Sequence, residues 1–294
     1  MNFKSSNETG SGPDFSDIIF DFGANTGEDI EYYLNRTSRV IAVEADPSLA
    51  LIIKNKFAEQ ILNGKLVLVN KVLTDNDVPK VDFYLHKTNP GLNQFQQPSI
   101  EMLEKFTVVE LEAINVVSLV TKFASQSLPP LYCKIDLEGF DLHILRALFN
   151  NGMYPIYLSA ECHTFEIASL IIATDKYEAF NLVEGESVPK FSYASNLSPG
   201  SSAMKQFRSF SAGPFGNDIP KGWLTKNAIL AQLNLFGPGW KDFHAVRSRS
   251  LLNQEVKRQL PIKLFIIGLV LRGYRSILPK VLRTSLWKLR QRRR

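Results

Sequence analysis

Carboxylate side chains follow four short apolar segments of the sequence, at the point where each segment ends. The segments are IIF, RVIAV, LYCKI and IYLSA, and the acids are Asp21, Glu44, Asp136 and Glu161. Continuous apolar runs of this length are typical of buried parallel strands. Because ligands of open α/β sheets bind where parallel strands end, we expect these four acids to line one site.

A glycine-rich turn follows the first segment. It consists of Gly23, Ala24, Asn25, Thr26 and Gly27. The turn has neither the GxGxxG spacing of a dinucleotide site nor the lysine of a P-loop. An acid at the end of the second strand, here Glu44, can accept both hydroxyls of a ribose. The pattern favours a cofactor that carries a ribose but no phosphate, and the alternative is a tight turn that binds nothing.

Four longer segments resemble the FkbM-type family of S-adenosylmethionine-dependent methyltransferases. They are DIIFDFGANTGED, VIAVEADPS, LYCKIDLEGFDLHIL and IYLSAECH, within residues 17–183. The resemblance implies an α/β, Rossmann-like class I methyltransferase fold, with a mostly parallel seven-stranded sheet and helices on both faces. Where the family often has a Leu-Asp pair, this chain has Ile114 and Asn115, which alters a helix cap.

The same resemblance implies S-adenosylmethionine as the cofactor. Its methionine end is expected at Asp21, Gly23, Asn25 and Gly27, and its ribose at Glu44. Ala24, Thr26 and Ala45 lie beside these residues and join the expected cofactor site. Asp75, which follows the third strand, is expected near the adenine.

The expected catalytic residues follow the fourth and fifth strands. They are Lys134, Asp136, Glu138, Glu161 and His163. Methyl transfer to a hydroxyl needs a base or a metal ion, and an imidazole with a pKa of ~6.5 suits the base. If a divalent metal binds, Asp136, Glu138 and Glu161 are its expected ligands, although no further pattern supports it. The alternatives are a helix cap for Asp136 and a purely structural role for His163. The other histidines are expected to be structural.

The elements that position these residues are predicted from the same patterns. Strands are expected at 17–22, 39–44, 65–69, 131–135, 156–160 and 240–246, and helices at 26–34, 47–60, 115–123, 139–149 and 225–233. Residues 72–74 and 81–86 are expected to form a hairpin, and the Asn- and Gln-rich segment 87–98 a lid or substrate loop. We therefore divide the chain into a flexible polar start (1–16), a methyltransferase core (17–187), an irregular substrate cover with a late strand (188–250) and a basic helical tail (251–294).

The charge of the chain is unevenly distributed. The whole chain has 294 residues and a net charge of +5, but residues 241–294 hold 15 basic and two acidic residues. This net charge of +13 leaves −8 for residues 1–240. A hydrophobic content of 45% is that of an ordinary globular protein, and two cysteines, Cys133 and Cys162, cannot form a disulfide framework.

The basic tail predicts a peripheral contact with an anionic membrane. Residues 260–294 read as an amphipathic helix interrupted at Pro279, with leucines on one face and arginines on the other. The alternative is that the apolar face packs on the body of the protein or on a second subunit. The longest apolar stretch, 264–271, is too short to span a bilayer, and nucleic-acid binding is not expected.

These observations predict an O-methyltransferase that acts on a hydroxyl of a sugar, glycan or natural product. The acceptor is expected to be a small molecule or a lipid-linked saccharide. The expected location is cytoplasmic, with a peripheral position on the cytoplasmic face of the membrane as a second expectation. The alternative function is a non-catalytic, methyltransferase-like module that binds partners at a membrane surface. No pattern identifies the acceptor or the oligomeric state.

Overall fold

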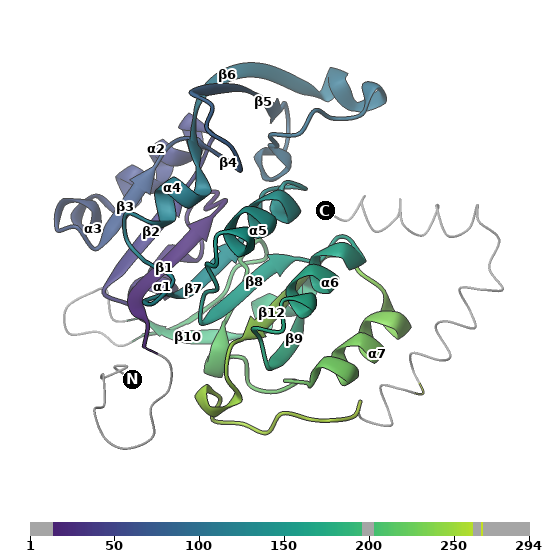
Figure 1. Ribbon diagram of the computed structural model, residues 1–294. Coiled ribbons are helices and arrows are strands. Elements are labelled where there is room, and N and C mark those ends of the chain that lie inside the picture. The colour runs from purple at the N-terminus through teal and green to yellow at the C-terminus, as the bar shows by residue number, and fades with distance from the viewer. Residues whose placement is uncertain (1–13, 196–202, 261–265, 267–294) are drawn as a thin grey trace.

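A seven-stranded sheet forms the centre of the molecule (Figure 1). The computed structural model describes residues 14–195, 203–260 and 266. The strand order is β3-β2-β1-β7-β8-β12-β9. The strands are β1 (Ser16–Phe22), β2 (Arg39–Val43), β3 (Leu66–Val69), β7 (Pro130–Ile135), β8 (Tyr157–Glu161), β9 (Ala179–Glu184) and β12 (Lys241–Val246). Strands β3, β2, β1, β7 and β8 are parallel, and β12 runs antiparallel to both of its neighbours. The predicted Rossmann-like class I methyltransferase fold is confirmed.

Helices cover both faces of this sheet because its strands are apolar on both sides. In β1, Phe20 and Phe22 face one core with α4, α5, α6 and α7, whereas Ile19 faces a second core with α1 and α2. All three side chains are fully buried. The helices are α1 (Ile30–Leu34), α2 (Pro47–Lys56), α3 (Ala58–Leu62), α4 (Val116–Val120), α5 (Asp141–Asn150), α6 (Phe165–Ala173) and α7 (Lys226–Phe236).

Two predicted helices are altered. The helix predicted at 26–34 begins only at Ile30, because Asn25 and Gly27 have φ angles of 51° and 73°, which an α-helix cannot contain. The helix predicted at 47–60 is divided at Phe57, whose φ of −119° separates α2 from α3. By contrast, Asn115 does cap the next helix, since its side chain accepts the N–H groups of Val117 and Ser118.

The predicted hairpin of 72–74 with 81–86 is wrong. Strands β4 (Val72–Thr74) and β5 (Lys80–His86) both pair with β6 (Phe106–Asn115), which lies between them. Strand β6 was not predicted, because in its FTVVELEAIN sequence only Phe106 is buried and two glutamates stand at alternate positions. Strands β5 and β6 extend beyond the main sheet (Figure 1).

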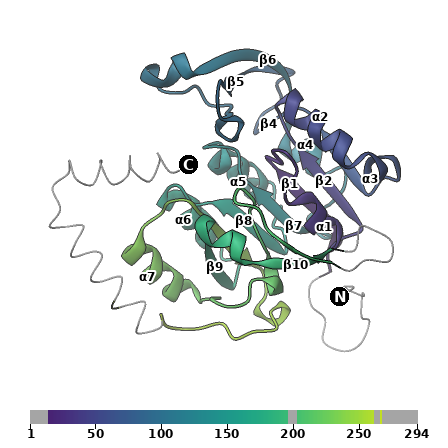
Figure 2. The same ribbon diagram turned by 180° about the vertical axis from the view of Figure 1, so that it is seen from behind.

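The segment predicted as an irregular cover packs against α1. It contains a hairpin of β10 (Ser192–Ser195) and β11 (Ala203–Gln206), and Figure 2 shows β10 beside α1. Tyr32 of α1 makes edge contacts with Tyr193, Phe207 and Phe215. The predicted helix at 225–233 and the late strand at 240–246 are confirmed as α7 and β12. The contacts of Tyr32 with the three aromatic rings hold the cover against α1, on one face of the sheet.

The predictions for the polar start and the basic tail fall largely outside the described residues. Residues 1–13, and all of 261–294 except Ile266, are not described. Among the helices that are described, none has the length and apolar character needed to cross a membrane.

Candidate cofactor and acceptor site

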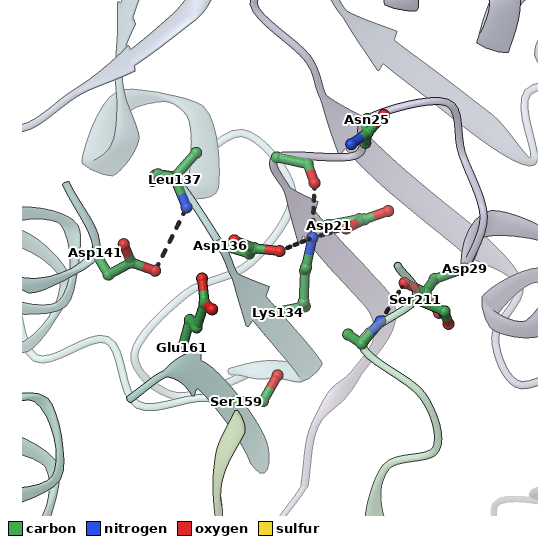
Figure 3. A network of polar contacts seen from close by, with 12 residues as sticks. Asp21, Asn25, Asp29, Lys134, Asp136, Leu137, Asp141, Ser159, Glu161 and Ser211 are labelled. Carbon is green, nitrogen blue, oxygen red and sulfur yellow. Dashed lines mark hydrogen bonds and ion pairs between the residues drawn. The ribbon is translucent and has the colours of Figure 1, made fainter. Parts of the chain in front are cut away.

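One cavity at the carboxyl edge of the sheet is lined by most of the residues that the sequence predicted. Its wall includes the glycine turn, the ends of β2, β7 and β8, and the start of β12. The predicted residues on the wall are Gly23, Ala24, Asn25, Glu44, Ala45, Lys134, Asp136, Glu138, Glu161 and His163. Figure 3 shows several of them converging from different strands. The predicted lid segment also contributes, through residues 89–93 and Phe95.

The glycine turn is held between two strands at a spacing that requires glycine. The N–H groups of Gly23 and Ala24 both donate to the carbonyl of Val43, at 3.0 Å. On the other side, a Cβ atom at Gly23 would lie 1.9 Å from the carbonyl oxygen of Asp136. The φ of Gly23 is 79°, in the left-handed region. The turn therefore depends on glycine for both its conformation and its fit.

Glu44 is fixed in the cavity wall by two backbone hydrogen bonds. Its carboxylate accepts the N–H of Asn25 at 2.7 Å and that of Asp46 at 2.9 Å. Burial raises the pKa of Glu44 to about 7, although these two hydrogen bonds act in the opposite direction. Each carboxylate oxygen has a second lone pair, so the group can still accept hydroxyls from a ligand.

Lys134 is a buried cation that connects the glycine turn to the acids of the sheet edge. Its Nζ donates to the carbonyl of Gly23 at 2.6 Å and lies 3.6 Å from Asp21 and 3.4 Å from Asp136 (Figure 3). Burial alone would lower the pKa of Lys134, but the carboxylates around it raise the pKa well above its usual value. Lys134 stays protonated and therefore positions other groups rather than acting as a base.

Four predicted cofactor residues do not line the cavity. Asp21 lies behind the wall, where burial raises its pKa to about 7 against the effect of Lys134. Thr26 and Gly27 lie on the side of the turn that leads into α1, and the carbonyl of Gly27 accepts a hydrogen bond from Lys56 Nζ. Asp75 lies 3.2 Å from His143 Nδ1 instead of facing the cavity, where contact with adenine was expected.

The part of the cavity wall that follows β7 and β8 brings together Glu138, Glu161 and His163. One ligand atom from each lies within 4.8 Å of the others, and His163 Nε2 is 2.7 Å from Glu161 Oε2. The expected metal set of Asp136, Glu138 and Glu161 is changed, because His163 takes the place of Asp136 in this group. Burial, and then the charges of Asp136 and Glu161, raise the pKa of Glu138 to about 9.

Asp136 does not cap the helix that follows it. The N-cap residue of α5 is Phe140, which makes no side-chain cap hydrogen bond, and the carboxylate of Asp141 instead accepts the N–H groups of Leu137 and Gly139 in the turn before the helix. The side chain of Asp136 faces the cavity and pairs with Lys134. His86, His143 and His244 do not line the cavity. Burial lowers the pKa of His244 to about 3.

Three acids of the cavity wall, Glu28, Asp29 and Asp242, were not predicted as site residues. Asp29 accepts hydrogen bonds from Ser211 Oγ and from the N–H of Ala212, so it joins the glycine turn to the cover. Asp242 lies opposite Glu161 in the pairing of β12 with β8. Since β12 is antiparallel, its first residues reach the edge where the parallel strands end. The acid in WKDF could have been found by applying the strand-end rule to the start of this strand.

The stability of the cofactor-free protein should depend on pH through the buried carboxyl groups of Asp21 and Glu44. A carboxyl whose folded pKa is about 7 keeps a proton that the unfolded chain releases near pH 4, so the free energy of unfolding falls as pH rises between about 4 and 7. We expect a Tm lower by roughly 5 °C at pH 7.5 than at pH 5.5. Glu44→Gln should flatten this dependence in a calorimetric series, and an equally steep profile would contradict the assignment.

Comparison with known proteins adds matches at the level of three-dimensional structure. No family model and no curated protein matches the sequence. The chain is similar to the methyltransferase FkbM from Methylobacillus flagellatus KT, with 14% identity and a TM-score of 0.35, over 56% of this chain and 39% of that chain. It is also similar to an O-methyltransferase from Bacillus cereus in complex with SAH, with 9% identity and a TM-score of 0.36, over 79% and 74% of the two chains. A third match is the precorrin 8w decarboxylase of Methanobacterium thermoautotrophicum, with 9% identity and a TM-score of 0.35, over 80% and 83%.

Proposed function

We propose that this chain is an S-adenosylmethionine-dependent O-methyltransferase that acts on a hydroxyl of a sugar, glycan or natural product. The observation that carries the proposal is the single cavity that joins two kinds of wall. One wall is the glycine turn with Glu44, which suits a nucleoside. The other is the group of Glu138, Glu161 and His163, which suits a hydroxyl that must lose its proton.

The charge of the cavity favours a cationic cofactor. Seven carboxyl groups line the wall, namely Glu28, Asp29, Glu44, Asp136, Glu138, Glu161 and Asp242. Lys134 pairs with Asp136 and with Asp21 behind the wall, and Lys71, which also lines the cavity, pairs with Glu112. A sulfonium group lowers the electrostatic energy of such a wall, whereas a phosphate would raise it. This distinction favours S-adenosylmethionine over a dinucleotide.

The proposed reaction is an in-line displacement at the methyl carbon. The acceptor oxygen forms a bond to this carbon while the carbon–sulfur bond breaks, and the electron pair stays on sulfur as the neutral thioether of S-adenosylhomocysteine. The hydroxyl proton is transferred to a basic group of the cavity wall, either Asp136 or the Glu161–His163 pair, all of which face the cavity. Orientation of the two reactants can supply much of the rate.

Loss of the Glu44 carboxylate should weaken cofactor binding. A hydrogen bond to a charged group contributes about 1.5–3 kcal/mol, so we expect Glu44→Gln to bind S-adenosylhomocysteine roughly 10- to 150-fold more weakly by calorimetry. Glu110→Gln is the matched control, since Glu110 is exposed and pairs with Lys80 on β5. No binding of S-adenosylhomocysteine to the unmodified chain would contradict the proposal.

Incubation with methyl-labelled cofactor and extracted glycans tests the transfer itself. Label in a saccharide or lipid-linked saccharide would support a saccharide acceptor, and label only in a hydroxyl compound that is neither a saccharide nor a natural product would replace the proposed acceptor class. Cofactor binding without transfer to any acceptor would favour the second candidate function, a non-catalytic module that binds partners at a membrane surface. Membership of the FkbM-type family, a cytoplasmic location and membrane contact through residues 260–294 belong to the same proposal.

A further inference from the structure

We propose that Glu138, Glu161 and His163 form a binding site for one divalent metal ion in the acceptor half of the cavity. The role of the ion in holding the acceptor hydroxyl rests on the proposed methyl transfer. Its binding does not, because the ligands are complete without a cofactor.

The spacing of the three ligand atoms fits a metal ion. Each lies within 4.8 Å of the other two, and His163 Nε2 is 2.7 Å from Glu161 Oε2. Metal–ligand bonds of about 2.0–2.2 Å place neighbouring ligand atoms roughly 3–4 Å apart. Binding therefore requires side-chain adjustments of about an ångström, without movement of the backbone. Three protein ligands would leave coordination positions open for an oxygen of the acceptor.

The ligands come from two neighbouring strands whose ends are fixed. Glu161 is the last residue of β8, its side chain is 10% exposed, and His163 follows two residues later. Glu138 belongs to the turn between β7 and α5, and Asp141 holds this turn by accepting the N–H of Gly139. The parallel pairing of β7 with β8 sets the distance between the two ligand segments. The site is thus built into the sheet edge.

The charges around the group favour a cation at this place. Asp136 and Asp242 also face the cavity, and Asp242 lies opposite Glu161 in the β12–β8 pairing. The nearby lysine, Lys134, contacts Asp21, Asp136 and the carbonyl of Gly23. A divalent ion would offset the negative charge of the carboxylates that Lys134 does not contact. With His163 and Glu161 as ligands, Asp136 remains on the wall to take the hydroxyl proton.

A second histidine–carboxylate pair in the chain provides a matched control. His143 Nδ1 lies 3.2 Å from Asp75 Oδ2, outside the cavity. Within the described residues, no third ligand completes this pair. Asp75→Asn therefore removes a similar contact without touching the proposed site.

Titration of the full chain with Mn²⁺, followed by electron paramagnetic resonance and without cofactor, tests the proposal. We expect one Mn²⁺ site, at least tenfold weaker binding in Glu138→Gln and His163→Ala, and unchanged binding in Asp75→Asn. Mn²⁺ should also raise the Tm of the unmodified chain and of Asp75→Asn, but not of the two site variants. The Tm values without metal report whether each variant is folded.

The result overturns the proposal if the unmodified chain binds Mn²⁺ no more tightly than Glu138→Gln. Titration of the same proteins with S-adenosylhomocysteine separates this failure from failure of the proposed function. Cofactor binding without Mn²⁺ binding would reject the metal site alone. Mn²⁺ binding without cofactor binding would reject the methyltransferase and leave the metal site standing.

Discussion

Replacing Gly23 with alanine should abolish cofactor binding. The added Cβ would lie 1.9 Å from the carbonyl oxygen of Asp136, and the φ of 79° is itself unfavourable for alanine. Because both the turn and the end of β7 must move, we expect S-adenosylhomocysteine to bind at least about 100-fold more weakly in a calorimetric titration. With about 3 kcal/mol lost from overlap and strain, the Tm should fall by roughly 6 °C or more.

Gly64 provides the control for this substitution. Its φ of 76° matches that of Gly23, but no atom lies within 4 Å of where its Cβ would be. Gly64→Ala therefore bears only the conformational cost, about 1 kcal/mol, and should bind the cofactor normally. If both variants bound it equally well, the fit against Asp136 would have no functional role.

Lys134→Met should cause the largest loss of stability. The substitution removes the buried cation from beside Asp21 and Asp136 and leaves the carbonyl of Gly23 without its donor. Breaking a buried ion pair costs about 3–5 kcal/mol, which corresponds to a fall of roughly 10 °C in Tm for a chain of this size. Differential scanning calorimetry of the purified variant measures the effect.

Two further variants make the test of Lys134 specific. Lys80→Met breaks the exposed pair with Glu110 and should change stability by less than about 1 kcal/mol. Combining Lys134→Met with Asp21→Asn removes both charges of the buried pair, so the double variant should recover part of the lost stability. A double variant as unstable as the sum of the two single variants would show that the pair is not coupled.

The sequence predicted the parts of the site that depend on local spacing. The GANTG turn and Glu44 each sit at a strand end, and a parallel sheet brings such ends together whatever the rest of the chain does. Strands β1, β2, β7 and β8 could be predicted because each contains a continuous apolar run, which is also a local feature of the sequence. The fold class, and the meeting of the glycine turn with Glu44 at one cavity, could therefore be predicted.

The parts that were missed depend on contacts between distant segments. Asp29 meets Ser211 across 182 residues, and the spacing of the sequence carries no sign of that pairing. Strand β6 is half exposed, so it lacks the apolar run that made the other strands visible. The exchange of Asp136 for His163 in the metal group depends on side-chain directions after two different strands, which a prediction of strand positions does not supply.

The place of β12 in the sheet has a consequence for how the molecule is made. Strand β9 pairs within the main sheet only with β12, which lies between β9 and β8. During synthesis, the edges of β8 and β9 stay open until residues 241–246 have emerged from the ribosome. Unpaired strand edges invite contacts with other chains, so β12, the last strand among the described residues, protects the nascent chain from aggregation as well as closing the sheet.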